Sequence, residues 1–107
     1  MSNVIEVDPE TVKSWIDQGE AQIIDVREDQ ELASYSLVGA LHIPMSMFDV
    51  EAVPKDGHKK LVFMCAHGMR SLQVGQYLLD NNHVSEAYNM TGGVAAWAGA
   101  GLPSDAT

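Results

Sequence analysis

Two nearly continuous apolar runs constrain the fold of this 107-residue chain more than any other feature. Residues 23–26 are IIDV and residues 61–64 are LVFM, so apolar side chains follow one another instead of alternating with polar ones. A strand of this kind is buried on both faces, which is typical of a parallel sheet covered by helices on each side. Shorter runs at residues 41–43 and 87–90 predict two further strands.

Helical segments are expected between these strands. Asp8, Pro9 and Glu10 combine an N-cap residue, a proline at the first helical position and an acidic first turn, and Gly19 favours the end of this helix. Further helices are expected at residues 28–34, 71–81 and 94–100, one helical turn at 46–50, and loops at 54–60 and 65–70. The alternation of strands and helices predicts a parallel α/β fold.

The charge balance excludes several classes of partner. The chain has 6 Lys and Arg residues against 15 Asp and Glu residues, a formal net charge of −9. Nucleic acids and anionic membranes are bound by basic surfaces, so neither is expected as a partner. A small anion must be held by local groups, such as backbone amides or one well-placed arginine, because the overall field repels it.

Length and cysteine content indicate one domain, residues 1–107, that does not depend on oxidation. The single cysteine excludes an intrachain disulfide, which suits a reducing compartment. The start of the sequence lacks the pattern of a signal peptide. No apolar run approaches the roughly 20 residues that cross a bilayer. We therefore expect a cytoplasmic protein without membrane contact.

The segment richest in chemistry is residues 65–71, CAHGMRS, directly after the apolar run at 61–64. In open α/β sheets, ligands bind at the carboxyl ends of strands, where this loop is expected. If the loop curls around the sulfur of Cys65, its amides form an anion-binding nest, and the following helix adds its positive end. Both stabilise the nucleophilic thiolate. Gly68 allows the turn, and Arg70 can bind an oxyanion with two N–H groups.

A second interpretation of Cys65 stays open at this point. A lone cysteine after an apolar strand is commonly just a small buried hydrophobe. Gly68 and Arg70 have no evident packing role at a strand end, which favours a reactive thiol. The pattern alone leaves these two interpretations about equal.

Three blocks of sequence resemble the rhodanese family, in the order in which that family carries them. Cys-x-x-Gly-x-Arg-Ser at residues 65–71 is similar to its active-site loop. The other blocks are DVR at 25–27 with Glu31 and GALHIP at 39–44, and YNMTGG at 88–93 with Trp97 and GLP at 101–103. Together they cover residues from about 5 to 103. The resemblance implies a single rhodanese-like domain, with a mostly parallel five-stranded sheet and helices on both faces.

The resemblance also implies a sulfurtransferase. Cys65 would take sulfur from a small anionic donor such as thiosulfate, forming a persulfide, and an acceptor such as cyanide or a thiol would remove it. The main alternative is a carrier that delivers this sulfur to a protein partner, with little turnover of free thiosulfate. No cofactor and no metal would be needed. The substrate-binding residues would be Ala66, His67, Gly68, Met69 and Arg70.

Two further classes of protein are disfavoured. Cys65 and Arg70 are separated by four residues, whereas the related phosphatases use five around the larger phosphoryl group; a phosphatase or arsenate reductase is therefore not expected. The intact Cys65 and Arg70 also argue against a binding module without catalysis. One departure from the family is YSL at residues 35–37, where Gly-His-Ile is usual, and it affects local packing or the choice of partner.

The remaining polar residues are interpreted as structural. Arg27 and Glu31 are four residues apart, which suits either an ion pair at a helix start or a role in bracing the fold, and Asp25 is expected to form structural hydrogen bonds. His67 is expected to face solvent at the rim of the loop. Metal-ligand spacing is absent from the other histidines, His42, His58 and His83.

Overall fold

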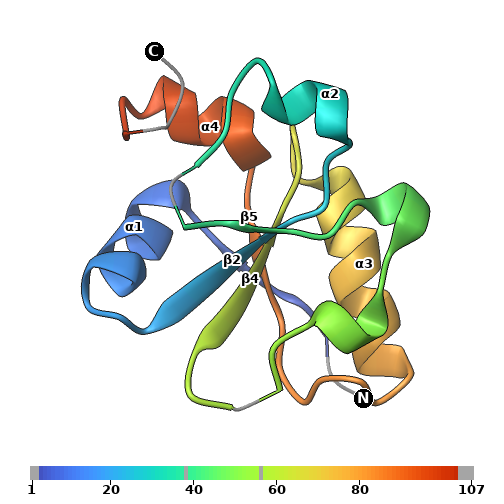
Figure 1. Ribbon diagram of the computed structural model, residues 1–107. Coiled ribbons are helices and arrows are strands. Elements are labelled where there is room, and N and C mark those ends of the chain that lie inside the picture. The colour runs from blue at the N-terminus through green and yellow to red at the C-terminus, as the bar shows by residue number, and fades with distance from the viewer. Residues whose placement is uncertain (1–2, 38, 56, 104–107) are drawn as a thin grey trace.

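A five-stranded sheet forms the centre of the computed structural model, which describes residues 3–37, 39–55 and 57–103 (Figure 1). Every neighbouring pair of its strands is parallel. In spatial order, the strands are β1 (Ile5–Val7), β5 (Tyr88–Met90), β4 (Lys60–Met64), β2 (Ala21–Asp25) and β3 (Leu41–His42). The predicted five-stranded α/β architecture is confirmed.

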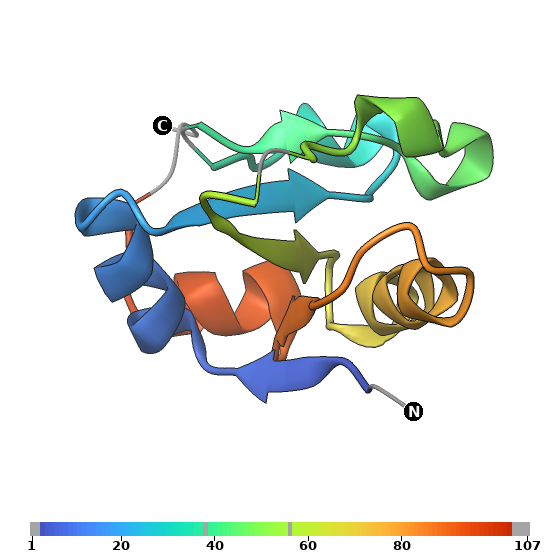
Figure 2. The ribbon, with the colours of Figure 1, turned by 90° about the horizontal axis from the view of Figure 1, so that it is seen from below.

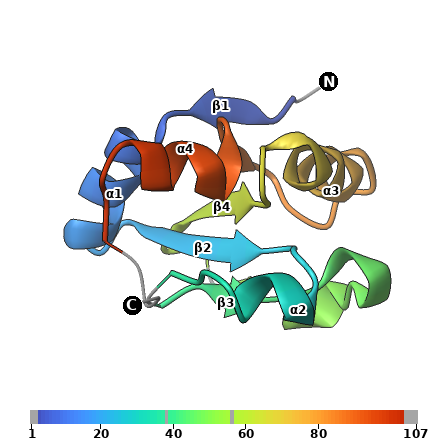
Figure 3. The ribbon, with the colours of Figure 1, turned by 90° about the horizontal axis from the view of Figure 1, so that it is seen from above.

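Helices cover both faces of the sheet. The helices α1 (Pro9–Asp17) and α4 (Gly93–Gly99) lie on one side, and α3 (Met69–Asp80) lies on the other (Figures 2 and 3). The remaining elements are the short helix α2 (Asp29–Leu32) and the 3₁₀ turns η1 (Met45–Met47) and η2 (Val50–Ala52). Within the described ranges, no helix has the length and apolar character needed to cross a membrane.

The apolar side chains of β4 pack into two hydrophobic clusters, one on each face of the sheet. Val62 and Met64 pack in the cluster that includes residues of α1 and α4, whereas Leu61 and Phe63 pack in the cluster that includes residues of α3. All four side chains are buried. The absence of alternating polar residues in this strand follows directly, because neither face meets water.

Several elements begin or end a residue or two from their predicted bounds, and the differences in α3, α2 and β1 are the most informative. The helix α3 begins at Met69 instead of residue 71, so Arg70 lies in its first turn and not in the loop. The helix α2 has only 4 residues, against the expected 28–34. No pattern predicted β1, because Ile5 and Glu6 are exposed and only Val7 is partly buried, so its sequence contains no buried run.

Arg27 pairs with Asp25 and not with Glu31, so the predicted ion pair at the helix start was wrong, whereas the structural role of Arg27 is confirmed. Its guanidinium donates from Nε to Asp25 Oδ1 at 3.0 Å and from Nη2 to Asp25 Oδ2 at 2.8 Å, and both side chains are buried. The four-residue spacing rule fails because Glu28 is the N-cap of α2, so Arg27 precedes the helix that carries Glu31.

The segment at residues 35–37 lies beside the buried Arg27–Asp25 ion pair. The backbone carbonyl of Tyr35 accepts a hydrogen bond from Arg27 Nη2 at 2.8 Å. Leu37 is buried in the cluster beneath α1 and α4. The segment whose sequence departs from Gly-His-Ile therefore lies between the buried ion pair at the end of β2 and the hydrophobic cluster on the side of α1 and α4.

We expect Arg27→Met to lower the free energy of unfolding by about 3–5 kcal/mol, because it leaves the Asp25 carboxylate buried without its cation. Urea denaturation at neutral pH measures this loss. Lys13→Met is the matched control: it breaks the more exposed Lys13–Asp17 pair and should cost under about 1 kcal/mol. Equal losses in the two variants would show that burial of the Asp25–Arg27 pair is unimportant.

Candidate active site

The loop after β4 turns sharply at Gly68. Cys65 directly follows the last residue of β4, and Gly68 is the N-cap of α3 with a φ of +96°. A side chain is strained in this conformation, and a Cβ at Gly68 would lie 3.1 Å from the backbone nitrogen of Gly92. Glycine meets both constraints and lets the chain return towards the sulfur.

Three hydrogen-bond donors converge on Sγ of Cys65. The amide of Gly68 lies 3.1 Å from the sulfur, and the amide and hydroxyl of Ser71 each lie 3.4 Å from it. Burial raises the pKa of the Cys65 thiol, but the hydroxyl of Ser71 and the amides of Ser71, His67 and Gly68 together outweigh it. The pKa of Cys65 therefore lies below its ordinary value, which favours the nucleophilic thiolate.

Cys65 is also a core residue. It is 1% exposed and belongs to the hydrophobic cluster that includes residues of α3. The loop around it is nearer the surface: Ala66 is partly buried, and the side chains of His67 and Met69 are exposed. Burial alone agrees with a packing role, whereas three polar donors aimed at one sulfur have no packing purpose.

A buried polar network joins this sulfur to β1. The hydroxyl of Ser71 lies 2.5 Å from Oδ1 of Asn89, and Nδ2 of Asn89 donates to the carbonyl of Gly68 at 2.9 Å and to the carboxylate of Glu6. A hydroxyl carries one proton, so Ser71 donates either to Asn89 or to Sγ. Asn89 was missed from the sequence, although an amide in an otherwise apolar strand was the available signal.

The turn before α4 holds the other side of the loop. The amides of Val94 and Ala95 donate to the carbonyls of Cys65 at 2.9 Å and Ala66 at 3.0 Å. Gly93 has a φ of +62°, and a Cβ there would lie 2.7 Å from the carbonyl carbon of Ala66. The turn at Gly92 and Gly93 is thus part of the support of the loop.

Arg70 forms a two-pronged ion pair with Glu31. Its Nη1 and Nη2 donate to Oε1 and Oε2 of Glu31 at 2.7 and 2.8 Å. This pair raises the pKa of Arg70, which the nearby Cys65 also raises, and lowers the pKa of Glu31 to about 2. Sequence reasoning missed the partnership because the two residues are 39 positions apart.

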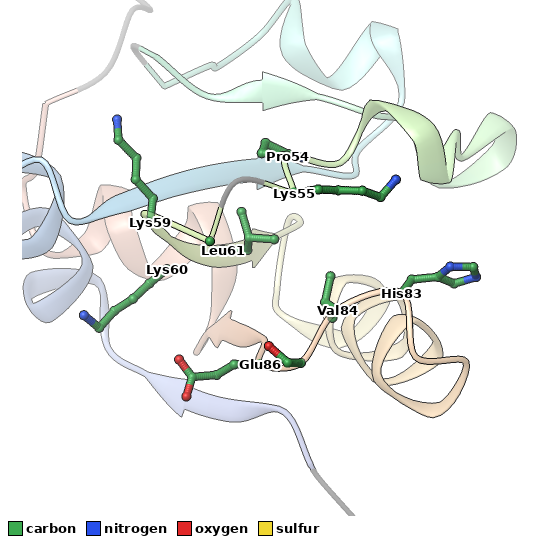
Figure 4. Close-up of a pocket in the computed structure, with 10 residues that line it drawn as sticks. Pro54, Lys55, Lys59, Lys60, Leu61, His83, Val84 and Glu86 are labelled. Atoms are coloured by element: carbon green, nitrogen blue, oxygen red, sulfur yellow. The ribbon is translucent and has the colours of Figure 1, made fainter.

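A separate cavity of about 290 Å³ lies at the amino end of β4, away from this loop (Figure 4). Lys55, Lys59 and Lys60 contribute to its lining, but Figure 4 shows their side chains pointing in different directions, so they do not converge on one ligand. None of the predicted site residues at 65–70 lines this cavity.

The histidines outside the loop have other surroundings. Nε2 of His42 lies 2.6 Å from the carbonyl of Arg27, and His83 lines the cavity at the amino end of β4. Among residues 3–37, 39–55 and 57–103, no three His, Cys, Asp or Glu side chains are grouped as a metal site requires.

Sequence and structure comparisons relate the chain to sulfurtransferases. It is 37% identical over 86 residues to a putative sulfurtransferase of Bacillus subtilis, YtwF, covering 80% of this chain and 82% of that protein. It is 26% identical to thiosulfate sulfurtransferase GlpE of Vibrio cholerae over the full length of both. The structure superposes on the human single-domain sulfurtransferase TSTD1 with a TM-score of 0.72 at 26% identity, covering 92% of this chain and 97% of that one.

The family assignment rests on a match that covers most of the chain. Residues 8–100, which include every strand except β1 and all of the loop around Cys65, match the family described as Rhodanese-like domain. The chain therefore belongs to the rhodanese-like domain family.

Proposed function

We propose that this chain is a sulfurtransferase that carries sulfur on Cys65 as a persulfide. The observation that carries the proposal is the convergence of the Gly68 amide and the Ser71 amide and hydroxyl on one sulfur. These donors stabilise a thiolate before the reaction, and they suit the negative charge of a persulfide after it. The sulfurtransferase names of the relatives support the same reaction class.

The proposed reaction has two displacements. The Cys65 thiolate attacks the outer sulfur of a donor such as thiosulfate; a new S–S bond forms, the donor's S–S bond breaks, and sulfite leaves with the bonding electron pair. An acceptor such as cyanide then attacks the outer sulfur of the Cys65 persulfide. Thiocyanate leaves and the thiolate is restored, so the cycle consumes no external oxidant or reductant.

The proposed roles of the loop residues follow from their positions. The amides between Ala66 and Arg70 hold the charge of the persulfide and of the incoming donor. The exposed side chains of His67 and Met69 form the rim of the site. Arg70 adds a permanent positive charge beside the sulfur. A thiol that must stay reduced to react suits a reducing compartment such as the cytoplasm.

A carrier that passes its sulfur to a protein partner is the second candidate. The ion pair between Arg70 and Glu31 favours it, because both Nη groups of the arginine are already engaged and are less available to a free anionic donor. In that case, the first displacement occurs but release to small acceptors is slow.

Intact mass spectrometry tests the proposed persulfide. After treatment with thiosulfate, we expect the wild-type protein to gain about 32 Da, the mass of one sulfur, because the Cys65 thiolate displaces sulfite. Cyanide should remove the added mass. Cys65→Ser should gain nothing, and a wild-type protein that gains no sulfur from any sulfane donor would refute the proposal.

Removal of the Ser71 hydroxyl tests how the thiolate is stabilised. We expect Ser71→Ala to raise the pKa of Cys65, because the hydroxyl is the strongest of the groups that lower it. The midpoint of the alkylation rate of Cys65 by iodoacetamide against pH should move upward. Ser14→Ala, an exposed serine of α1, serves as the control, and an unchanged midpoint in Ser71→Ala would contradict the assigned contact.

A further inference from the structure

The cation of the site is already neutralised by a residue from another element. Glu31 comes from α2, which lies at the same end of the sheet as the start of α3 (Figure 1). Its two carboxylate oxygens accept hydrogen bonds from Nη1 and Nη2 of Arg70. The side chains of Arg70 and Glu31 are only 35% and 29% exposed, so solvent screens this pair incompletely.

Glu31 is held in place by further hydrogen bonds. The amide of Glu28 donates to Oε1 of Glu31 at 3.0 Å, and the side chain of Glu28 accepts from the amide of Ser46 at 3.2 Å and from its hydroxyl. These contacts tie α2 to the start of η1. The carboxylate of Glu31 is therefore a built part of the surroundings of Arg70 and not a loose surface group.

The local charge is negative once Cys65 is ionised. The one positive charge of Arg70 then faces two negative charges, those of the thiolate and of Glu31. A further carboxylate, that of Glu28, lies one residue before α2. Arg27 is engaged by buried Asp25, and Lys13 by Asp17. The other lysines, Lys55, Lys59 and Lys60, line the cavity at the amino end of β4 (Figure 4), and five residues of strand place Lys60 roughly 16 Å from Cys65.

We propose that Glu31 determines donor specificity, so that the site prefers a sulfane-sulfur donor with at most one negative charge over a dianion such as thiosulfate. This inference rests on the proposed function and narrows its donor class. A dianion gains from Arg70 but is repelled by both the thiolate and Glu31, whereas a monoanion loses less from the same repulsion. Thiosulfonates and organic persulfides are donors of the favoured class.

The chemistry of the first displacement is the same for both classes. With a thiosulfonate, the Cys65 thiolate bonds to the outer sulfur, the S–S bond of the donor breaks, and a sulfinate leaves with the electron pair. With thiosulfate, sulfite leaves instead. The methanethiosulfonate anion carries a methyl group where thiosulfate carries a negatively charged oxygen. The two donors therefore form a pair of probes that differ by one unit of charge.

The experiment compares kcat/KM for these two donors, with cyanide as acceptor. We expect Glu31→Gln to shift the preference towards thiosulfate by about fivefold to tenfold, the size expected for one nearby, partly screened charge. Asp29→Asn is the matched control: it removes the same charge from the same helix, but the Asp29 side chain is 90% exposed and should shift the ratio less than about twofold. Higher ionic strength should also narrow the wild-type preference, which needs no variant.

The outcomes separate this inference from the proposed function. An unchanged ratio in Glu31→Gln, an equal shift in Asp29→Asn, or equal losses for both donors would overturn the role of Glu31 while sulfur transfer still stands. The role of Glu31 would also be overturned if ionic strength did not change the ratio of kcat/KM for the two donors in the wild-type protein. If the wild-type protein took sulfur from neither donor, the proposed function would fall, and the inference with it.

Discussion

The hydrogen bonds that converge on Sγ of Cys65 depend on a loop that is fixed from two sides. On one side, Gly68 turns the chain into α3 and aims two amides at the sulfur. On the other side, the first amides of α4 bind the carbonyls of Cys65 and Ala66, and Gly93 has no room for a side chain. A trans peptide group directs its N–H away from its C=O, so α4, by holding the Ala66 carbonyl, leaves the amide of His67 to face the sulfur, where it too lowers the pKa of Cys65. The anion-stabilising geometry is thus a consequence of backbone packing and not of charged side chains.

Burial and reactivity are compatible at Cys65 for the same reason. A thiol in the core normally resists ionisation, and burial does raise the pKa of Cys65. The opposing hydrogen bonds come from groups that are themselves fixed, since Ser71 is fully buried and Asn89 beside it is 1% exposed. Fixed dipoles need no reorganisation when charge appears on the sulfur. A packing role alone would account for the burial of Cys65 but not for the hydrogen-bond donors around its sulfur.

Local patterns predicted what depends on neighbouring residues and missed what depends on tertiary contacts. The apolar run of β4, the N-cap Asp8 and the loop after β4 were predictable, because each is encoded within a few residues. The pairing of Arg70 with Glu31 joins segments 39 residues apart, and the four-residue spacing favoured Arg27 instead. The contribution of Asn89 was equally hidden, since its partners Ser71 and Glu6 come from α3 and β1.

The parallel sheet explains why residues so distant in sequence meet here. Arg27 and α2 follow the end of β2, Cys65 follows β4, and the glycine turn follows β5. Because the strands are parallel, all of these connections lie at the carboxyl edge of the sheet. Each can therefore contact the loop around Cys65 without any extra segment of chain. The same arrangement brings Glu31 against the only cation beside the sulfur among the described residues. In a chain of net charge −9, this contact pairs that cation with a carboxylate, so the other groups that face the sulfur are backbone amides of the loop and the hydroxyl of Ser71.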